Sequence, residues 1–337
     1  MLEKLVAEAR RYDATYGGGL ANHLPMTLIA LDRMGAGPQR LREFAGMYTG
    51  RLRSVTGDSA RIARENWRNS KGVPGDYPAL LRFFSGEISR LGWRDSLTEY
   101  LPELTPGIGA AAFHALIRTA FGVTAGLPDE IAAGLAYWCS DYLQLPAAAA
   151  ENVTFATPEP ADLLDRMRRD SRFDYAVEED ALIDDAMLKA SDHAEFGAIV
   201  EALLIDAETP RRLADVAAAV HAAANDFTSL HMITGLQALR VILPHAPEPV
   251  ALVRAGWAAI AAAYLSIGKP APATPMQMAA WRVATVPDWP AILAAAIDSD
   301  DEHVVKLTYA CLEEGRLTGD RIYRWLAARA TGLVTAQ

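Results

Sequence analysis

The stretch Gly17-Gly18-Gly19-Leu20-Ala21-Asn22-His23-Leu24-Pro25-Met26 is the one around which this chain is organised. Three glycines permit backbone angles that other residues resist, and they allow a chain or a ligand to approach closely. Asn22 is a good helix cap and Pro25 suits a first helical turn, so we predict a helix over residues 24–34. His23 would then lie at the mouth of that helix. The alternative is a plain turn, with His23 as a capping or packing residue.

Outside this stretch the chain is rich in alanine and leucine, and β-branched alternation bounded by turns is scarce. We therefore predict an all-α fold, a large multi-helix domain of packed helical pairs around an apolar core. Prolines open many of the apolar segments, where their missing N–H costs little. The helices are expected over residues 2–16, 24–34, 41–52, 78–91, 107–121, 128–143, 161–169, 180–189, 194–205, 210–221, 226–243, 249–266, 275–284, 290–296, 300–314 and 320–330.

The chain has 337 residues, of which 51% are hydrophobic, enough for a large core. We expect a single domain over residues 1–337, with a candidate internal linker at residues 146–160, where alanines give way to Asn, Thr and prolines. Residues 65–76 are polar, with Gly and Pro, and are expected to form a loop. We find no repeat of fixed period, which argues against a solenoid.

The net charge of −10 and the pI near 5.2 argue against non-specific binding of nucleic acid, which needs Lys and Arg to neutralise phosphates. The N-terminus carries charges of both signs, unlike a secretory signal. The longest uncharged apolar run, between Arg254 and Lys269, is too short for a bilayer span, so no membrane partner is expected. Two cysteines, Cys139 and Cys311, fit a reducing cytoplasm, and neither has the CxxC neighbour of a thiolate zinc site.

Seven histidines are the candidates for chemistry. His114 and His231 each lie in an apolar helical run, so their imidazoles are expected in the interior. His303 and Lys306 are three residues apart, which places them on adjoining parts of one helix face. Each has an ordinary alternative: a buried histidine is more often a hydrogen-bonded core residue than a ligand, and Lys306 reads equally as a snorkelling surface lysine. We rank His193, His221 and His245 lower.

The signatures of common enzymes are absent from the sequence: it has no HExxH, GxSxG or P-loop. Residues 107–112, Gly-Ile-Gly-Ala-Ala-Ala, match the dinucleotide fingerprint GxGxxA. That fingerprint should follow a strand and open a βαβ unit. The residues before it do not read as a strand, so we expect these glycines to allow close packing at a helix start.

Four segments together carry a family resemblance: residues 19–37, 113–119, 230–240 and the run Asp301-Glu302-His303-Val304-Val305-Lys306. In this order they resemble the questin oxidase-like family, over about residues 2–314. The resemblance implies a helical protein. Its fungal members oxidise anthraquinones in a Baeyer–Villiger-like ring opening, and the family was first described as NADPH-dependent.

The same resemblance implies a non-haem iron site built from histidines and an unusual modified lysine. Matched by motif, the metal ligands would be His23, His114, His231 and Lys306, with His303 as a further candidate. The chain departs from the family pattern at Met26, Thr27 and Phe121, where additional histidines are expected. A reduced ligand set leaves a different metal, a looser site or no metal open.

We therefore expect an iron-dependent oxygenase that uses dioxygen on an aromatic or polyketide-like small molecule. Dioxygen reacts slowly with closed-shell organic compounds, so an oxygenase needs a metal or an organic cofactor, and imidazoles suit Fe(II). One alternative is an NADPH-dependent Baeyer–Villiger-type oxidase without metal. Another is a helical small-molecule-binding protein whose catalytic site has decayed. Aromatic residues are candidates for lining a flat pocket, although core packing is the usual role of such side chains: Trp67, Tyr137, Trp138, Trp257 and Trp281.

Overall fold

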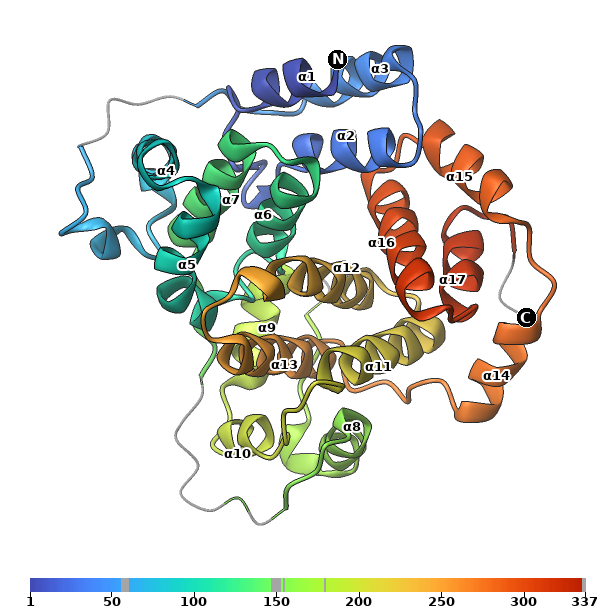
Figure 1. The fold of residues 1–337 in the computed structure, drawn as a ribbon. Helices are drawn as coiled ribbons and strands as arrows, with labels where there is room; N and C mark the ends of the chain where they lie inside the picture. Colours follow the sequence, from blue (N-terminus) through green and yellow to red (C-terminus); the bar gives the residue numbers. More distant parts are fainter. Residues whose placement is uncertain (56–60, 147–152, 154, 179, 335–337) are drawn as a thin grey trace.

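Helices dominate the computed structural model, which describes residues 1–55, 61–146, 153, 155–178 and 180–334 (Figure 1). The all-α prediction is confirmed, and the only strands among the described residues form one two-stranded hairpin. The helices are α1 (Leu2–Ala9), α2 (Leu24–Arg33), α3 (Pro38–Thr49), α4 (Tyr77–Leu91), α5 (Trp93–Leu104), α6 (His114–Ala125), α7 (Pro128–Ser140), α8 (Pro160–Arg169), α9 (Ile183–Ser191), α10 (Phe196–Glu201), α11 (Thr209–Ala224), α12 (Phe227–Ile242), α13 (Pro249–Ser266), α14 (Pro275–Val283), α15 (Trp289–Asp298), α16 (Glu302–Thr318) and α17 (Ile322–Ala330).

The hairpin replaces the second half of the first expected helix. Strands β1 (Thr15–Tyr16) and β2 (Leu20–Ala21) pair antiparallel, with Thr15 opposite Ala21. Gly17, Gly18 and Gly19 join them with φ angles of 54°, 90° and 122°, a region that favours glycine. The prediction of a helix over residues 2–16 is therefore wrong after Ala9, because the glycines turn the chain back before α2 begins.

Two segments expected to lack structure are partly ordered. Residues 65–76 contain two 3₁₀ turns, Trp67–Ser70 and Pro74–Asp76. Within the candidate linker, residues 147–152 and 154 lie outside the described residues. Thr157, in its described part, pairs with the chain around Leu203: its N–H donates to Ala202 O at 2.9 Å, and its carbonyl accepts from Leu204 N–H at 2.9 Å. The single domain over residues 1–337 stays a prediction.

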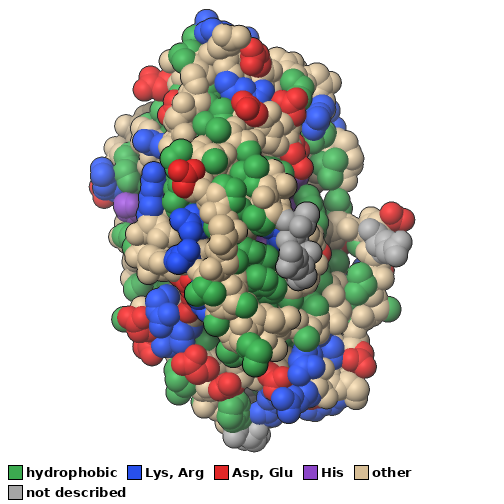
Figure 2. All heavy atoms as spheres, turned by 90° about the vertical axis from the view of Figure 1, so that its right-hand side faces the viewer, with side chains coloured by type: hydrophobic (Ala, Val, Ile, Leu, Met, Phe, Trp, Pro, Cys, Tyr) green, Lys and Arg blue, Asp and Glu red, His purple; other side chains and the backbone are tan. Residues whose placement is uncertain are grey.

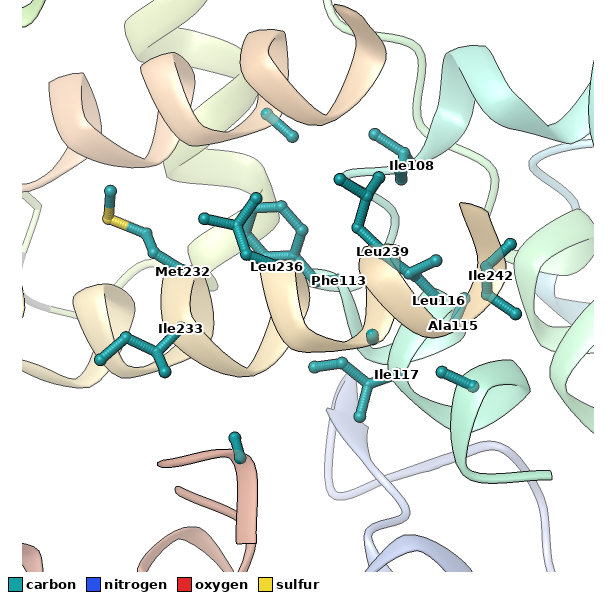
Figure 3. Packing of buried hydrophobic residues seen from close by; sticks show 14 of the residues in the cluster. Ile108, Phe113, Ala115, Leu116, Ile117, Met232, Ile233, Leu236, Leu239 and Ile242 are labelled. Carbon is teal, nitrogen blue, oxygen red and sulfur yellow. The ribbon is translucent and has the colours of Figure 1, made fainter. Parts of the chain in front are cut away.

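The central packing joins α6 and α12. Figure 3 shows Phe113 beside Leu236 of α12, and Leu116 beside Leu239. At Gly235 an added Cβ would lie 2.8 Å from the Phe113 ring, so glycine allows this close approach. α13 is long and apolar enough to pass a test for a membrane span by length and composition, but 67% of that window is buried inside the protein. α13 therefore packs as a helix of the protein core.

A second close approach, between α6 and α7, yields a stability prediction. A Cβ at Gly134 would lie 2.6 Å from Thr119 Cα and 2.7 Å from Thr119 N, and backbone atoms cannot rotate away. We expect Gly134→Ala to lower the free energy of unfolding by roughly 1–3 kcal/mol, the usual cost of overpacking. Urea denaturation measures this change.

Gly46 provides the matched control, because it is exposed in α3 and a Cβ there would meet nothing within 4 Å. Gly46→Ala should raise the free energy of unfolding by roughly 0.5–1 kcal/mol, since alanine is the better helix former. Equal effects of the two substitutions would contradict the steric argument.

Four helices, α2, α6, α12 and α16, form a closed ring. α2 packs on α6 and α16, and α12 also packs on α6 and α16 (Figure 1). The surface is mixed in charge: on the face that Figure 2 shows, acidic and basic side chains are interspersed, with hydrophobic side chains between them. Despite the net charge of −10, the acidic side chains on this face do not form one continuous patch.

Candidate metal centre

Three buried histidines from three helices of the ring meet at their Nε2 atoms. His23 Nε2 lies 2.7 Å from His114 Nε2, and His231 Nε2 lies 3.1 Å from the same atom. The three residues are 5%, 6% and 0% exposed. The structure therefore brings together side chains that are 91 and 117 residues apart in the sequence.

Each of these histidines lies near the beginning of its helix. His23 is the N-cap residue of α2, where Asn22 Oδ1 accepts the Leu24 N–H at 3.1 Å. His114 is the first residue of α6, and His231 is the fifth residue of α12. The positive ends of these helix dipoles therefore point toward the cluster, which disfavours protonated imidazoles there.

The start of α6 differs from the prediction of a helix over residues 107–121. A 3₁₀ turn at Thr105–Gly107 is followed by Ala111, Ala112 and Phe113 with φ angles of 46°, 54° and 68°, and only then does the helix begin. Left-handed conformations in residues other than glycine cost on the order of 1–3 kcal/mol each. The burial of Phe113 against α12 and a hydrogen bond from the His114 ring to Ala111 O hold this turn in place.

Hydrogen bonds at the Nδ1 atoms fix how the rings are protonated. His114 Nδ1 bonds to Ala111 O, and His231 Nδ1 bonds to Phe227 O at 2.7 Å. Because a carbonyl oxygen only accepts, both Nδ1 atoms carry the proton and both neutral rings present a lone pair at Nε2. His23 Nδ1 lies 3.5 Å from Glu302 Oε1 and has no hydrogen-bond partner. The lone pairs of His114 Nε2 and His231 Nε2 therefore face each other at 3.1 Å, an arrangement that a cation between them would stabilise.

Burial keeps these imidazoles neutral. It lowers the pKa of His23, His114 and His231 well below 6.5, and the nearby charge of Lys306 lowers each of them further. Neutral imidazole is the form that binds a metal.

His303 joins the cluster from α16. Its ring centroid lies 4.6 Å from that of His23 and 5.6 Å from that of His231. One possible ligand atom from each of His23, His114 and His303 lies within 4.8 Å of the others. His303 Nε2 is buried without a hydrogen-bond partner, while Nδ1 lies 3.4 Å from Asp301 Oδ1. Burial lowers the pKa of His303, and the Asp301 carboxylate opposes that shift.

Lys306 follows His303 by one turn of α16, and its side chain points inward. It is 1% exposed, and its Nζ atom is buried with no hydrogen-bond partner. Burial lowers the pKa of this amine to about 7. The alternative of a snorkelling surface lysine is therefore wrong. Its charge affects the pKa of all four histidines of the cluster.

Glu302 is a neighbour of the cluster that sequence reasoning did not single out. The residue is 9% exposed, and its carboxylate lies between His23 Nδ1 and the Arg51 guanidinium, which is 3.8 Å from Oε2. Carboxylates in this position orient a metal-binding histidine. The only sequence feature that pointed to Glu302 was the acidic pair directly before His303. Acidic residues at a helix start are also common as ordinary caps, and Asp301 has that role here.

A cavity of about 250 Å³ opens onto the histidines. Its walls include Tyr16 and Leu20 of the hairpin, Leu182 and Asp184 at the start of α9, and Phe227. Leu20 and Phe227 are about half exposed and mark the mouth. Larger hollows exist elsewhere, including one of about 910 Å³ beside Arg64, but no histidine lines it.

The five aromatic residues considered as pocket lining are absent from this cavity. Trp138 Nε1 donates to Gly107 O, and Trp257 Nε1 donates to Ile199 O, so both rings are fixed in the core. Trp281 stacks on Trp325, and Trp67 packs among Phe83, Phe84 and Tyr100. Tyr137 is fully buried. The lining aromatics are Tyr16 and Phe227, which have no periodic pattern that would identify them.

The positions at which the resemblance implied more histidines serve in packing. Met26 is fully buried, and Thr27 Oγ1 donates to the backbone carbonyl of His23 at 3.0 Å. Phe121 packs against Tyr309. The GxGxxA match follows the helix α5 and a 3₁₀ turn; among the described residues no strand leads into it. It therefore lacks the setting of a dinucleotide-binding turn.

Comparisons with known proteins identify the family of this chain. The family model described as questin oxidase-like matches residues 20–311. A Baeyer–Villiger oxidase of Paecilomyces divaricatus, AgnL3, is 28% identical over 155 residues, which are 41% of this chain and 34% of that protein. The Baeyer–Villiger oxidase ptaJ of Pestalotiopsis fici is 28% identical over 127 residues, 34% of this chain and 29% of that protein. The matches thus span about a third of these relatives. With the family model covering most of its length, the chain belongs to the questin oxidase-like family.

Proposed function

We propose that this protein is an oxidoreductase, an iron-dependent oxygenase that acts with dioxygen on an aromatic or polyketide-like small molecule. The observation that carries the proposal is the meeting of three buried Nε2 atoms: His114 Nε2 lies 2.7 Å from that of His23 and 3.1 Å from that of His231. Hydrogen bonds at Nδ1 leave a lone pair at Nε2 of both His114 and His231. Two relatives described as Baeyer–Villiger oxidases support the oxidative class.

His23, His114 and His231 would hold the iron, with His303 as a fourth imidazole. Imidazoles suit Fe(II), and ligand positions left open admit oxygen and substrate. When bound, the iron supplies the electronic means to react with dioxygen, which closed-shell organic molecules lack.

The charge balance of the site calls for an anionic group. Several helix N-termini and a dication would otherwise place positive charge together in a buried volume. Glu302 provides one carboxylate beside His23. We propose that Lys306 provides a second: its neutral amine adds carbon dioxide, forming an N–C bond and releasing one proton, and a carbamate oxygen then binds the metal.

The remaining residues bind the substrate and limit access of water. The cavity is lined mainly by apolar side chains and reaches His23, His114 and His303 directly. Insertion of one oxygen atom from dioxygen leaves the second to be reduced to water by two electrons. Either the substrate or NADPH must supply them, so NADPH stays a candidate co-substrate. Both cysteines are buried free thiols, which supports the proposed cytoplasmic location.

The direct test is the metal content. We expect protein purified under anaerobic conditions to contain about one iron per chain by elemental analysis, in keeping with a single histidine cluster. Removal of iron with a chelator should abolish oxygen uptake with a panel of naphthols and naphthoquinones, and added Fe(II) should restore it. The assay is run with and without NADPH.

Other results would favour the alternatives. A yellow protein that contains no metal but consumes oxygen with NADPH would replace the iron proposal by a flavin-dependent oxidase. Equilibrium binding of these aromatic compounds without any oxygen uptake, whatever metal is added, would indicate a decayed catalytic site.

A further inference from the structure

Asp184 is an acidic side chain in a largely apolar cavity wall. It lies in the first turn of α9 and lines the cavity with Leu182, Ile183 and several alanines. It is remote in sequence from the histidines and belongs to none of the segments that carry the family resemblance. Its neighbour Asp185 is exposed and does not line the cavity.

Within the described part of the chain, no cationic side chain contributes to the pKa shift of the Asp184 carboxylate. Its Oδ1 accepts the Asp185 N–H at 3.1 Å, and the Ala111 backbone also favours its charged form. Burial raises the pKa of Asp184, and the neighbouring Asp185 charge raises it further. A partly buried carboxylate in apolar surroundings retains acceptor capacity that a ligand can use.

Asp184, Ala111 and His114 line the same cavity. The Ala111 carbonyl accepts a hydrogen bond from His114 Nδ1–H. Asp184 therefore shares its cavity with a ring whose Nε2 atom meets those of His23 and His231. A ligand group bound to Asp184 would be held beside the cluster.

We propose that Asp184 is a specificity-determining residue that accepts a hydrogen bond from a hydroxyl group of the substrate. The inference rests on the proposed function, because it takes the histidine cluster to be the reacting end of the cavity. The ligand it selects is a neutral, compact, mainly apolar molecule that carries a hydroxyl donor. An ether or a hydrogen at that position leaves the carboxylate unpaired.

The volume of the cavity and the charges around it restrict the class of ligand further. A volume of about 250 Å³ is just below the ~300–1,000 Å³ of pockets for drug-sized ligands, so one or two fused rings fit best. The wall beside Asp184 is tight: an added Cβ at Gly19 would lie 2.7 Å from Leu182 Cδ1. A cationic ligand is disfavoured because the inner end holds a metal cation in the proposed function, together with the buried Lys306 amine and several helix N-termini.

The test compares 2-naphthol with 2-methoxynaphthalene, which differ by the hydroxyl donor. Anaerobic titrations followed by naphthalene fluorescence are performed on iron-loaded and on iron-free protein. We expect 2-naphthol to bind at least ~10-fold more tightly to the native protein, the effect of one hydrogen bond to a charged acceptor. Asp184→Leu should bring the two affinities within about twofold, and Asp184→Asn should reduce the preference severalfold. Asp185→Asn, the matched control, should preserve it.

Several outcomes would overturn the proposal. Equal binding of the two probes by the native protein would do so, as would a preference that survives in Asp184→Leu. Tighter binding of 1-naphthylmethylammonium than of 2-naphthol would show that the site selects a cation.

A purely structural role makes a different prediction. If Asp184 only fixes the Ala111 turn, Asp184→Leu should lose iron while Asp184→Asn, which still accepts N–H bonds, keeps both iron and the hydroxyl preference. The binding readout needs neither iron nor oxygen. Absence of hydroxyl selectivity in the native protein therefore contradicts the role of Asp184, whereas selective binding by a protein that never holds iron contradicts the oxygenase proposal alone.

Discussion

His114→Ala is expected to yield a folded protein that retains no iron and shows no oxygen uptake. His114 Nε2 is the atom shared by both close contacts of the cluster, at 2.7 Å to His23 and 3.1 Å to His231. Loss of a neighbouring residue that only orients a ligand typically costs 10–100-fold in metal affinity, so loss of the central ligand should cost roughly 100-fold or more. Elemental analysis after gel filtration and an oxygen electrode measure the two effects.

The fold should survive this substitution. The ring's hydrogen bond to Ala111 O is worth about 1 kcal/mol, and the neighbouring Phe113 keeps its packing on α12. Circular dichroism should therefore show helicity close to that of the native protein. His221→Ala is the matched control: His221 is also a buried imidazole, bonded to Ser229 Oγ at 2.8 Å, and it lies outside the cluster. It should lose stability but keep iron. An unchanged iron content of His114→Ala would show that His114 is a core residue and not a metal ligand.

Lys306→Met is expected to lose iron and oxygen uptake as well. Methionine keeps most of the apolar stem and removes the unpartnered amine. If Lys306 served only to fill the core, this substitution would be neutral or stabilising, because it removes a buried group without a hydrogen bond. The site role therefore predicts a folded protein that holds no metal, with a Tm equal to or higher than that of the iron-free native protein.

Two further variants distinguish a role of the Lys306 amine itself from a role of its carbamate. Lys306→Arg keeps a positive charge but cannot form the lysine carbamate, so iron and activity should be lost; retention of both would remove Lys306 from the site. Lys306→Glu restores a carboxylate near the ligand position and should recover part of the iron content. Native protein refolded without carbon dioxide should bind iron poorly until bicarbonate is added. Iron binding that is indifferent to bicarbonate and to Lys306→Met would contradict the carbamate proposal.

Helical class and the start of α2 could be predicted from the sequence because both depend on local chemistry. Alanine, leucine and helix-opening prolines indicate helices wherever they occur. The order Gly-Gly-Gly, Asn22, His23, Pro25 fixes the beginning of α2 within a few residues, and the structure has it at Leu24. The start of α6 could not be predicted in this way. Ala111, Ala112 and Phe113 are ordinary residues for a helix, yet they adopt left-handed angles where Phe113 packs on α12.

The same distinction between local chemistry and tertiary packing applies to the candidate site. Sequence by itself determined which side chains are capable of the chemistry: four histidines and one lysine within recognisable segments. The tertiary structure decided that His23, His114 and His231 point at one another, that Lys306 is buried and not at the surface, and that Glu302 and Asp184 belong beside them. Distances between residues separated by 91 and 117 positions depend on how helices pack, and packing is a property of all the apolar faces together. No local pattern contains that information, because it arises only when α2, α6, α12 and α16 close into a ring.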